Sequence, residues 1–304
     1  GAPSGRLQGV EQEGEKTMGK IVIVGSGPAG CSAALYAARA GQEVVVISMG
    51  MGALSKAELI QNYYGFEEGI TGAELYRQGV VGAKAVGAEF ITAEVVGLDY
   101  TGSLVVQTTE GDYSADAVIL ATGAGRIAPK IAGLAEHEGR GVSYCATCDA
   151  FFYRGKTAAV LGSGEYALHE VQALLPLAGK VILCTNGEPL TADFPEGVEI
   201  CTEKLAAVEG EEKVSALRLE NGELLPVEGL FVALGVAGSA ALARKLGAPV
   251  ENGRIVVDER MQTGIPGLYA AGDCTGGLLQ VCKAVYEGAL AATEAIKMLR
   301  GKKR

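Results

Sequence analysis

Residues 20–30 read KIVIVGSGPAG, a short apolar strand that runs directly into a glycine-rich turn. The alanine-rich segment from about Cys31 to Ala40 predicts a helix that ends at Gly41, and residues 43–47 predict a second apolar strand. Strand, G-x-G-x-x-G turn, helix and strand in this order are typical of a dinucleotide-binding unit. The glycines let the backbone approach a pyrophosphate, and the amides at the helix N-terminus hold its charge.

The same pattern returns later in the chain. Residues 157–161 predict a strand, GSGEYA at 162–167 a turn with a helix to about Leu177, and residues 180–185 another strand. We therefore expect the α/β fold class, with two Rossmann-like dinucleotide-binding domains of three layers and the second inserted in the first. The expected boundaries are 1–17 for a flexible leader, 18–112 and 234–304 for the first domain, and 113–233 for the inserted one.

The remaining segments are placed by periodicity and turn residues. Residues 52–66 predict a loop and residues 72–87 a helix, and the last helix is expected over 280–299. Strand-like alternating segments are predicted over 89–98, 104–109 and 113–120.

Residues 145–149 read CATCD and place two thiols three positions apart, with an acid directly after the second. In an α/β chain this spacing is typical of a redox pair, whose thiolate attacks disulfides. Zinc requires four ligands, and the sequence has no second C-x-x-C; its two histidines, His137 and His169, stand far apart. The motif therefore favours thiol–disulfide chemistry, and we expect no metal.

Composition narrows the class of protein further. The 304 residues suffice for two domains, and the net charge of −10 disfavours a nucleic-acid partner. Seven scattered cysteines do not have the pattern of the disulfide framework of a small secreted protein. No apolar run has the length of a membrane span or a signal peptide, so we expect a cytoplasmic protein without a membrane partner. Five cysteines lie in or beside apolar runs and are expected to be small buried residues: Cys31, Cys184, Cys201, Cys274 and Cys282.

Together these stretches resemble the low-molecular-weight thioredoxin reductases, flavoproteins with an FAD domain and an inserted pyridine-nucleotide domain that carries the disulfide. The resemblance runs from about Met18 to Leu299 and is most specific over 139–154, GRGVSYCATCDAFFYR. It implies a homodimer. It also implies that Cys148 lies against the flavin, that Cys145 attacks the partner disulfide, and that Asp149 protonates the leaving thiolate. From the residues alone, Asp149 could instead cap a following helix.

The resemblance also carries over the family's binding positions. Arg140, Phe151 and Phe152 match positions that grip thioredoxin, although a solvated arginine and core aromatics would fit the residues equally. One family position is altered, because Ser48 replaces the acid that normally holds a ribose hydroxyl. The expected FAD-binding residues are Gly25, Ser26, Gly27, Pro28, Ala29, Gly30, Ser48, Leu54, Asn62, Val95, Ala121, Thr122, Gly123, Gly272, Asp273, Gln280 and Val281.

The second dinucleotide unit departs from the family. The strand that normally ends in His-Arg-Arg, followed by another arginine, reads Thr185-Asn186-Gly187 with Thr191 at the later position. Without guanidinium groups, the 2′-phosphate of NADPH loses its strongest charge-assisted bonds. The Glu165 carboxylate would repel a pyrophosphate, and the Tyr166 side chain could fill the space where the pyrophosphate would bind. Lys180 or Lys204 could replace the arginines, which would preserve NADPH binding.

The leading hypothesis is therefore an FAD enzyme that reduces thioredoxin or a thioredoxin-like protein. Some members of the superfamily that lack the nicotinamide motifs take electrons from reduced ferredoxin or carry a second flavin. This chain resembles that branch, so we expect ferredoxin as donor and partner. The alternatives are an NADPH-dependent thioredoxin reductase, a dithiol oxidase that uses oxygen, and a non-catalytic flavin redox sensor.

Overall fold

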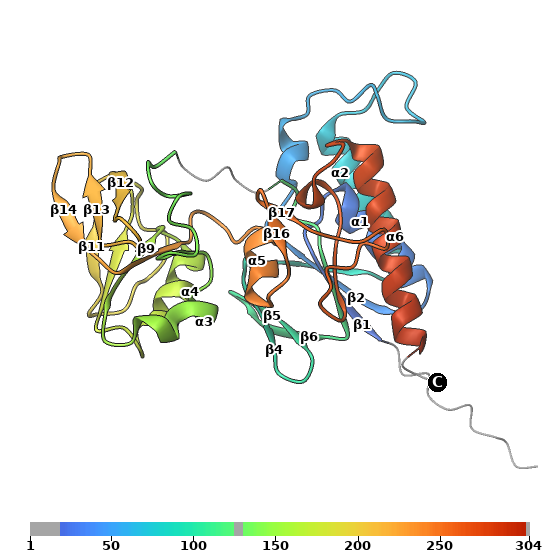
Figure 1. The fold of residues 1–304 in the computed structure, drawn as a ribbon. Helices are drawn as coiled ribbons and strands as arrows, with labels where there is room; N and C mark the ends of the chain where they lie inside the picture. Colours follow the sequence, from blue (N-terminus) through green and yellow to red (C-terminus); the bar gives the residue numbers. More distant parts are fainter. Residues whose placement is uncertain (1–18, 125–129, 302–304) are drawn as a thin grey trace, which may run out of the picture.

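The computed structural model describes residues 19–124 and 130–301 (Figure 1). Its first unit is built on a five-stranded parallel sheet. The strand order is β18 (Leu268–Ala270), β7 (Ala117–Leu120), β1 (Lys20–Val24), β2 (Glu43–Ser48) and β3 (Glu89–Thr92). Strands β1, β2 and β7 are buried almost throughout, as parallel strands covered on both faces must be. The expected leader lies outside the described residues.

Three helices pack on this sheet or on one another: α1 (Pro28–Arg39), α2 (Gly72–Ala85) and α6 (Val281–Gly301). Helices α1 and α6 approach closely because small residues face each other. A Cβ at Gly288 would collide with the backbone of Ala29. Figure 1 shows α6, in red, running along the outside of this layer. The predicted helices are present, with ends that differ by a few residues.

The other part of the first unit is a three-stranded antiparallel sheet of β4 (Val95–Tyr100), β5 (Leu104–Thr108) and β6 (Gly111–Ala115). The strand-like segments predicted over 89–98 and 113–120 each form two strands, because the chain changes sheet within each segment. Ala93 and Glu94 separate β3 from β4, and Asp116 separates β6 from β7. The predicted domain boundary at 113 falls inside β6, and the chain enters the second sheet only after Leu120.

The second unit contains a parallel sheet of its own. Its order is β11 (Glu199–Cys201), β10 (Lys180–Cys184), β9 (Thr157–Leu161), β15 (Gly229–Val232) and β8 (Val142–Ser143). Helix α4 (Glu165–Leu174) packs on β9 and β10. A second core cluster joins this sheet to an antiparallel sheet of β12 (Leu205–Glu209), β13 (Ala216–Leu219) and β14 (Leu224–Pro226). The short helices α3 (Ala146–Asp149) and η2 (Ala150–Tyr153) follow β8.

After β15 the chain returns to the first unit through α5 (Ser239–Lys245), which contacts β4 and the hairpin of β16 (Val250–Glu251) and β17 (Arg254–Ile255). Two 3₁₀ turns, η1 (Gly52–Lys56) and η3 (Asp273–Thr275), complete the elements. The predicted fold class is confirmed: two Rossmann-like α/β units, the second inserted in the first. In the described ranges, no helix is both long and apolar enough to cross a membrane.

Candidate redox site and dinucleotide cradles

Cys145 and Cys148 form a disulfide across the short helix α3, with their Cα atoms 5.3 Å apart. Strand β8 pairs with β15, which fixes the start of the motif against the second sheet. The backbone N–H of Cys148 lies 3.2 Å from the Sγ of Cys145 and donates to it. In the reduced protein this donor at a helix N-terminus would favour the Cys145 thiolate.

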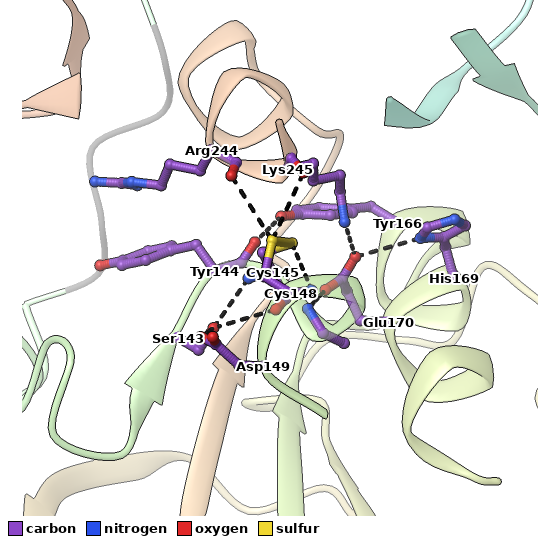
Figure 2. The surroundings of a disulfide bond; sticks show 11 residues. Ser143, Tyr144, Cys145, Cys148, Asp149, Tyr166, His169, Glu170, Arg244 and Lys245 are labelled. Atoms are coloured by element: carbon purple, nitrogen blue, oxygen red, sulfur yellow. Dashed lines mark hydrogen bonds and ion pairs between the residues drawn. A yellow bond between two sulfur atoms is a disulfide. The ribbon is translucent and has the colours of Figure 1, made fainter. Parts of the chain in front are cut away.

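Asp149 lies at the end of α3 and accepts a hydrogen bond from the hydroxyl of Ser143, 2.7 Å away (Figure 2). Ser143 also accepts from the backbone N–H of Cys145, so one side chain joins the acid to the redox motif. Asp149 precedes η2 but makes no capping hydrogen bond to it, so the capping alternative was wrong. Its carboxyl group is therefore linked to Cys145 through Ser143.

A buried charged cluster lies on the other side of α3 (Figure 2). The Glu170 carboxylate of α4 accepts from the backbone N–H of Ala146 and from the ammonium of Lys245 on α5, and the Nδ1 of His169 lies 3.3 Å away. Glu170 and Lys245 side chains are each 1% exposed. Burial raises the pKa of Glu170, but hydrogen bonds from His169, Lys245 and Ala146 outweigh it and leave that pKa below its ordinary value.

Helix α5 covers the disulfide. The Sγ of Cys148 lies 3.7 Å from the carbonyl oxygen of Arg244 and 3.8 Å from that of Lys245. The Arg244 guanidinium stacks on the Tyr144 ring at 4.5 Å from its centroid. In this arrangement Cys145 is buried, at 4% exposure, so a protein partner cannot reach its sulfur without separation of these elements.

The two predicted partner-binding phenylalanines are exposed on η2. Phe151 and Phe152 are each 67% exposed and meet edge to face, so the alternative of core aromatics was wrong. Arg140 is also exposed and donates to the Glu136 carbonyl oxygen. An exposed aromatic pair beside a redox motif is a surface that a protein partner could cover.

The glycine-rich turn of residues 25–30, the first dinucleotide cradle, has the backbone form that a pyrophosphate needs. A Cβ at Gly25 would collide with the Ala121 carbonyl, and one at Gly30 with the Gly25 carbonyl. A Cβ at Gly27 would meet no protein atom within 4 Å. Gly27 begins α1 without a capping side chain, so its first amides are free for a ligand. These residues fit a dinucleotide such as FAD.

Most of the other predicted FAD positions lie around this turn. The hydroxyl groups of Ser26 and Ser48 are 2.6 Å apart, and the Asn62 amide donates to Gln280 over 2.9 Å. A pocket of about 220 Å³ is lined by several predicted residues, among them Ser26, Gly27, Pro28, Leu54 and Val281.

Further predicted positions come from the neighbouring strand ends. Ala121 pairs with the end of β1, and Thr122 exchanges hydrogen bonds with Ser239 on α5. Gly272 packs against Ala29 and is followed by Asp273, whose carbonyl accepts from Arg254. Gly123 has a positive φ of 78° directly after Thr122. Val95 is buried at the start of β4, within a hydrophobic core cluster.

The second cradle is the glycine-rich turn of residues 162–167. Its backbone keeps the close approach seen in the first cradle, but the loop that contains Thr191 covers it. A Cβ at Gly162 would collide with the Ala233 carbonyl. The following loop folds back, and the Thr191 N–H donates to the Ser163 carbonyl over 2.8 Å. The Tyr166 side chain is buried, and its hydroxyl donates to the Tyr144 carbonyl.

A carboxylate of the first unit lies at the second cradle. Burial and the nearby Glu165 charge raise the pKa of Glu94, and the Tyr166 backbone N–H opposes that rise. Glu94 directly precedes β4, which contacts α4, so its carboxylate lies near the first turn of α4, where amides could otherwise bind a nucleotide pyrophosphate. Of the two lysines proposed as substitutes, Lys180 pairs with Glu199, and the Lys204 stem packs against Gly187.

The expectation for the remaining cysteines holds for three of five. Cys31, Cys184 and Cys274 are buried, whereas Cys201 is half-buried and Cys282 exposed. Burial raises the pKa of Cys31 to about 12 and that of Cys274 to about 11. Cys282 lies on the solvent side of α6, a face that an apolar neighbourhood in sequence does not reveal.

Sequence reasoning missed Glu170, Lys245 and Glu94. Glu170 could have been found, because it falls on the apolar face of α4 with Tyr166 and Leu174, where a charge needs a partner. The sequence around Lys245 and Glu94 does not reveal their roles, because the residues that they meet lie in the second unit.

Comparisons with known proteins agree with this geometry. The sequence profile described as pyridine nucleotide-disulphide oxidoreductase matches residues 19–288. A "Thioredoxin reductase" of Aquifex aeolicus is 36% identical over 308 residues, which covers 93% of this chain and 94% of the relative. The crystal structure of the atypical thioredoxin reductase TRi from Desulfovibrio vulgaris Hildenborough superposes with a TM-score of 0.88 at 40% identity, covering 94% of this chain and 99% of that one.

A ferredoxin-flavin thioredoxin reductase from Clostridium acetobutylicum superposes with a TM-score of 0.71 at 35% identity, covering 93% of this chain and 99% of that one. Fold, disulfide and cradle define the class as a two-domain disulfide oxidoreductase with a dinucleotide-binding fold. Within that class, the chain belongs to the thioredoxin reductase family of pyridine nucleotide-disulphide oxidoreductases.

Proposed function

We propose that this protein is an FAD-dependent enzyme that reduces thioredoxin, or a thioredoxin-like protein, through the Cys145–Cys148 pair. The observation that carries the proposal is the disulfide on α3, with an acid on one side and two exposed phenylalanines on the next turn. The relatives named thioredoxin reductase cover nearly the whole chain and support the same partner.

The chemistry proceeds by thiol–disulfide exchange. The Cys145 thiolate attacks one sulfur of the partner disulfide, and Asp149 gives a proton to the partner thiolate that leaves. Cys148 then attacks the Cys145 sulfur of the mixed disulfide, which releases the second partner thiol and restores the Cys145–Cys148 disulfide. Both electrons gained by the partner come from this dithiol. Bound FAD would supply the two electrons that reduce the pair again.

The glycine-rich turn of residues 25–30 would bind the pyrophosphate of FAD. Its support is the open space at Gly27 and the uncapped start of α1. Asn62 and Gln280, joined by a hydrogen bond, would lie beside the flavin ring, and Thr122 would lie where α5 meets the cradle. Asp273 would bind the ribityl or pyrophosphate region.

We further propose that electrons enter from reduced ferredoxin and not from NADPH. Three features support this donor: the arginine clamp is replaced by Thr185-Asn186-Gly187, Thr191 folds back on the turn, and Glu94 lies near the first turn of α4. A carboxylate at that position would compete with a pyrophosphate for the same amides. The similarity to a protein named ferredoxin-flavin thioredoxin reductase supports the same conclusion.

Arg140, Phe151 and Phe152 would form the contact surface for the partner. In the present arrangement Phe151 and Phe152 are exposed while Cys145 is buried under α5, so productive binding would require separation of α3 from α5. A homodimer and a cytoplasmic location stay predictions.

Anaerobic titration of the flavin-loaded protein with NADPH, NADH and reduced ferredoxin tests the donor. We expect only ferredoxin to bleach the flavin. Rapid bleaching by NADPH would overturn the donor proposal but leave the disulfide chemistry intact. A Cys145→Ser variant tests the disulfide chemistry separately: it should keep flavin reduction and lose thioredoxin reduction. Peroxide formation with reduced dithiols, without thioredoxin reduction, would favour the dithiol oxidase instead.

A further inference from the structure

A second pair of cysteines lies at the far edge of the second parallel sheet. In the register of β10 and β11, Cys184 lies directly beside Cys201. Side chains at paired positions of parallel strands point to the same face, and such strands lie about 4.8 Å apart. That spacing is within the Cα range of disulfides, roughly 4.4–6.8 Å. Both residues are free thiols in this structure.

The environments of the two thiols are unequal. Cys184 is completely buried, whereas Cys201 is half-buried and accessible to a small molecule. A hydrogen bond from Cys184 and another from the Glu203 backbone N–H lower the pKa of Cys201 to about 6, although burial and the Glu203 and Glu199 carboxylates oppose them. The hydrogen bond to Cys201 and burial raise the pKa of Cys184. An accessible nucleophile therefore has a second thiol in contact behind it.

This pair is separate from the redox site on α3. The sheet order is β11-β10-β9-β15-β8, and β8 leads into Cys145. Four strand spacings, about 19 Å in total, separate the two edges of the sheet. Sulfur atoms at that distance do not exchange directly, so neither pair is needed to form the other.

We propose that Cys201 and Cys184 form a second, reversible thiol–disulfide site that reacts with low-molecular-weight disulfides such as oxidised glutathione. The Cys201 thiolate attacks one sulfur of the small disulfide, whose S–S bond breaks and releases one thiolate, which takes a proton from solvent. Cys184 then loses its proton and attacks the Cys201 sulfur, which releases the second small thiol. Two protein thiols are oxidised to one disulfide, and one small disulfide is reduced to two thiols.

The bond would join the edge strand β11 to β10 and close the loop of residues 185–200. This loop contains Thr191, which folds back onto the second cradle. Oxidation would therefore restrain the loop over the vestigial nucleotide site, and this effect does not depend on the proposed electron donor.

Mass spectrometry of the full-length holoenzyme tests the site. The reduced protein is incubated with oxidised glutathione, quenched with iodoacetamide and digested with trypsin. Both cysteines lie in the single tryptic peptide 181–204. We expect this peptide to be two hydrogens lighter than its reduced form and to carry no alkyl group. Cleavage after Glu196 should then leave two fragments that remain joined until a reductant is added.

Two variants separate the roles of the two thiols. Cys184→Ser should trap glutathione on Cys201, because no resolving thiol remains, and Cys201→Ser should leave Cys184 unmodified. Cys282→Ser is the matched control, since it removes an exposed thiol far from the pair and should not change the result. A wild-type protein that retains glutathione on Cys201, or whose Cys184 and Cys201 are both alkylated after the incubation, would overturn the proposal.

Discussion

The ammonium of Lys245 and the carboxylate of Glu170 form a fully buried ion pair that joins α5 of the first unit to α4 of the second. The same carboxylate accepts the backbone N–H of Ala146 inside the redox motif. One of the contacts between the two units is therefore also a contact to the backbone of the redox motif. Cys148 packs on the carbonyls of Arg244 and Lys245 on the same helix, α5. Movement of α5 away from α4 would therefore break the ion pair and uncover Cys148.

Removal of one partner of this pair should open the redox site. Lys245→Met leaves the Glu170 charge buried without its cation, which typically costs about 3–5 kcal/mol. We expect a lower free energy of unfolding and faster alkylation of Cys145 in the reduced protein. Lys180→Met, which breaks the exposed pair with Glu199, is the matched control and should cost about 0–1 kcal/mol. The double variant Lys245→Met with Glu170→Gln should recover part of the loss. Unchanged Cys145 alkylation in Lys245→Met would contradict a role of this ion pair in keeping the redox site closed.

Asp149 should be required for exchange with the partner and not for reduction of the flavin. Asp149→Asn keeps the shape and removes the proton donor, so we expect thioredoxin reduction to slow by roughly 10²-fold or more. Single-turnover mixing of the reduced enzyme with oxidised thioredoxin measures this step. Ser143→Ala, which removes the hydrogen bond to the acid and the one from the Cys145 N–H but leaves the carboxyl group, should have a smaller effect. Equal losses in both variants would indicate a structural role for Asp149.

Gly27 should control flavin binding without affecting the fold. Its φ of −69° suits alanine, and an added Cβ meets no protein atom within 4 Å. We therefore expect Gly27→Ala to keep the melting temperature of the apoprotein and to lose flavin, because the methyl group enters the space of the pyrophosphate. Flavin absorbance per protein and apoprotein melting measure the two effects. Gly30→Ala is the contrast: its Cβ collides with the Gly25 carbonyl, so it should impair both. Full flavin occupancy in Gly27→Ala would place the pyrophosphate elsewhere.

Glu94 should make stability depend on pH in a defined direction. Burial and the Glu165 charge raise its pKa above the ordinary value of about 4.5. The folded protein therefore holds this proton more tightly than the unfolded chain. The stability it contributes is complete below about pH 4.5 and is lost as the pH rises through the raised pKa.

A Glu94→Gln variant checks that direction. It should melt higher than the wild type at pH 7 and converge with it toward pH 4. Glu110→Gln, at an exposed position, should follow the wild type at every pH. Thermal melts from pH 4 to pH 8 provide the comparison, and a variant less stable than the wild type at pH 7 would contradict the assigned environment.

Local patterns were sufficient for much of this protein. The strand-turn-helix-strand order at residues 20–47 and its repeat at 157–185 are visible because each depends on contiguous residues with fixed glycine positions. The disulfide of Cys145 and Cys148 follows from a spacing of three residues. The predicted strand-like segments break at Glu94 and Asp116, where hydrophobic alternation continues while the chain changes sheet. Alternation reports which face of a strand is buried and not which sheet the strand joins.

The sequence by itself determined the fold class, the redox pair and the absence of arginine at residues 185–187 and 191, because each is written in residue types at short, fixed spacings. Only the tertiary structure decided that Lys245 meets Glu170, that Glu94 lies at the second cradle, and that Cys184 lies beside Cys201. These contacts join residues far apart in the chain. They depend on strand register and on the packing of one unit against the other, which no local pattern encodes.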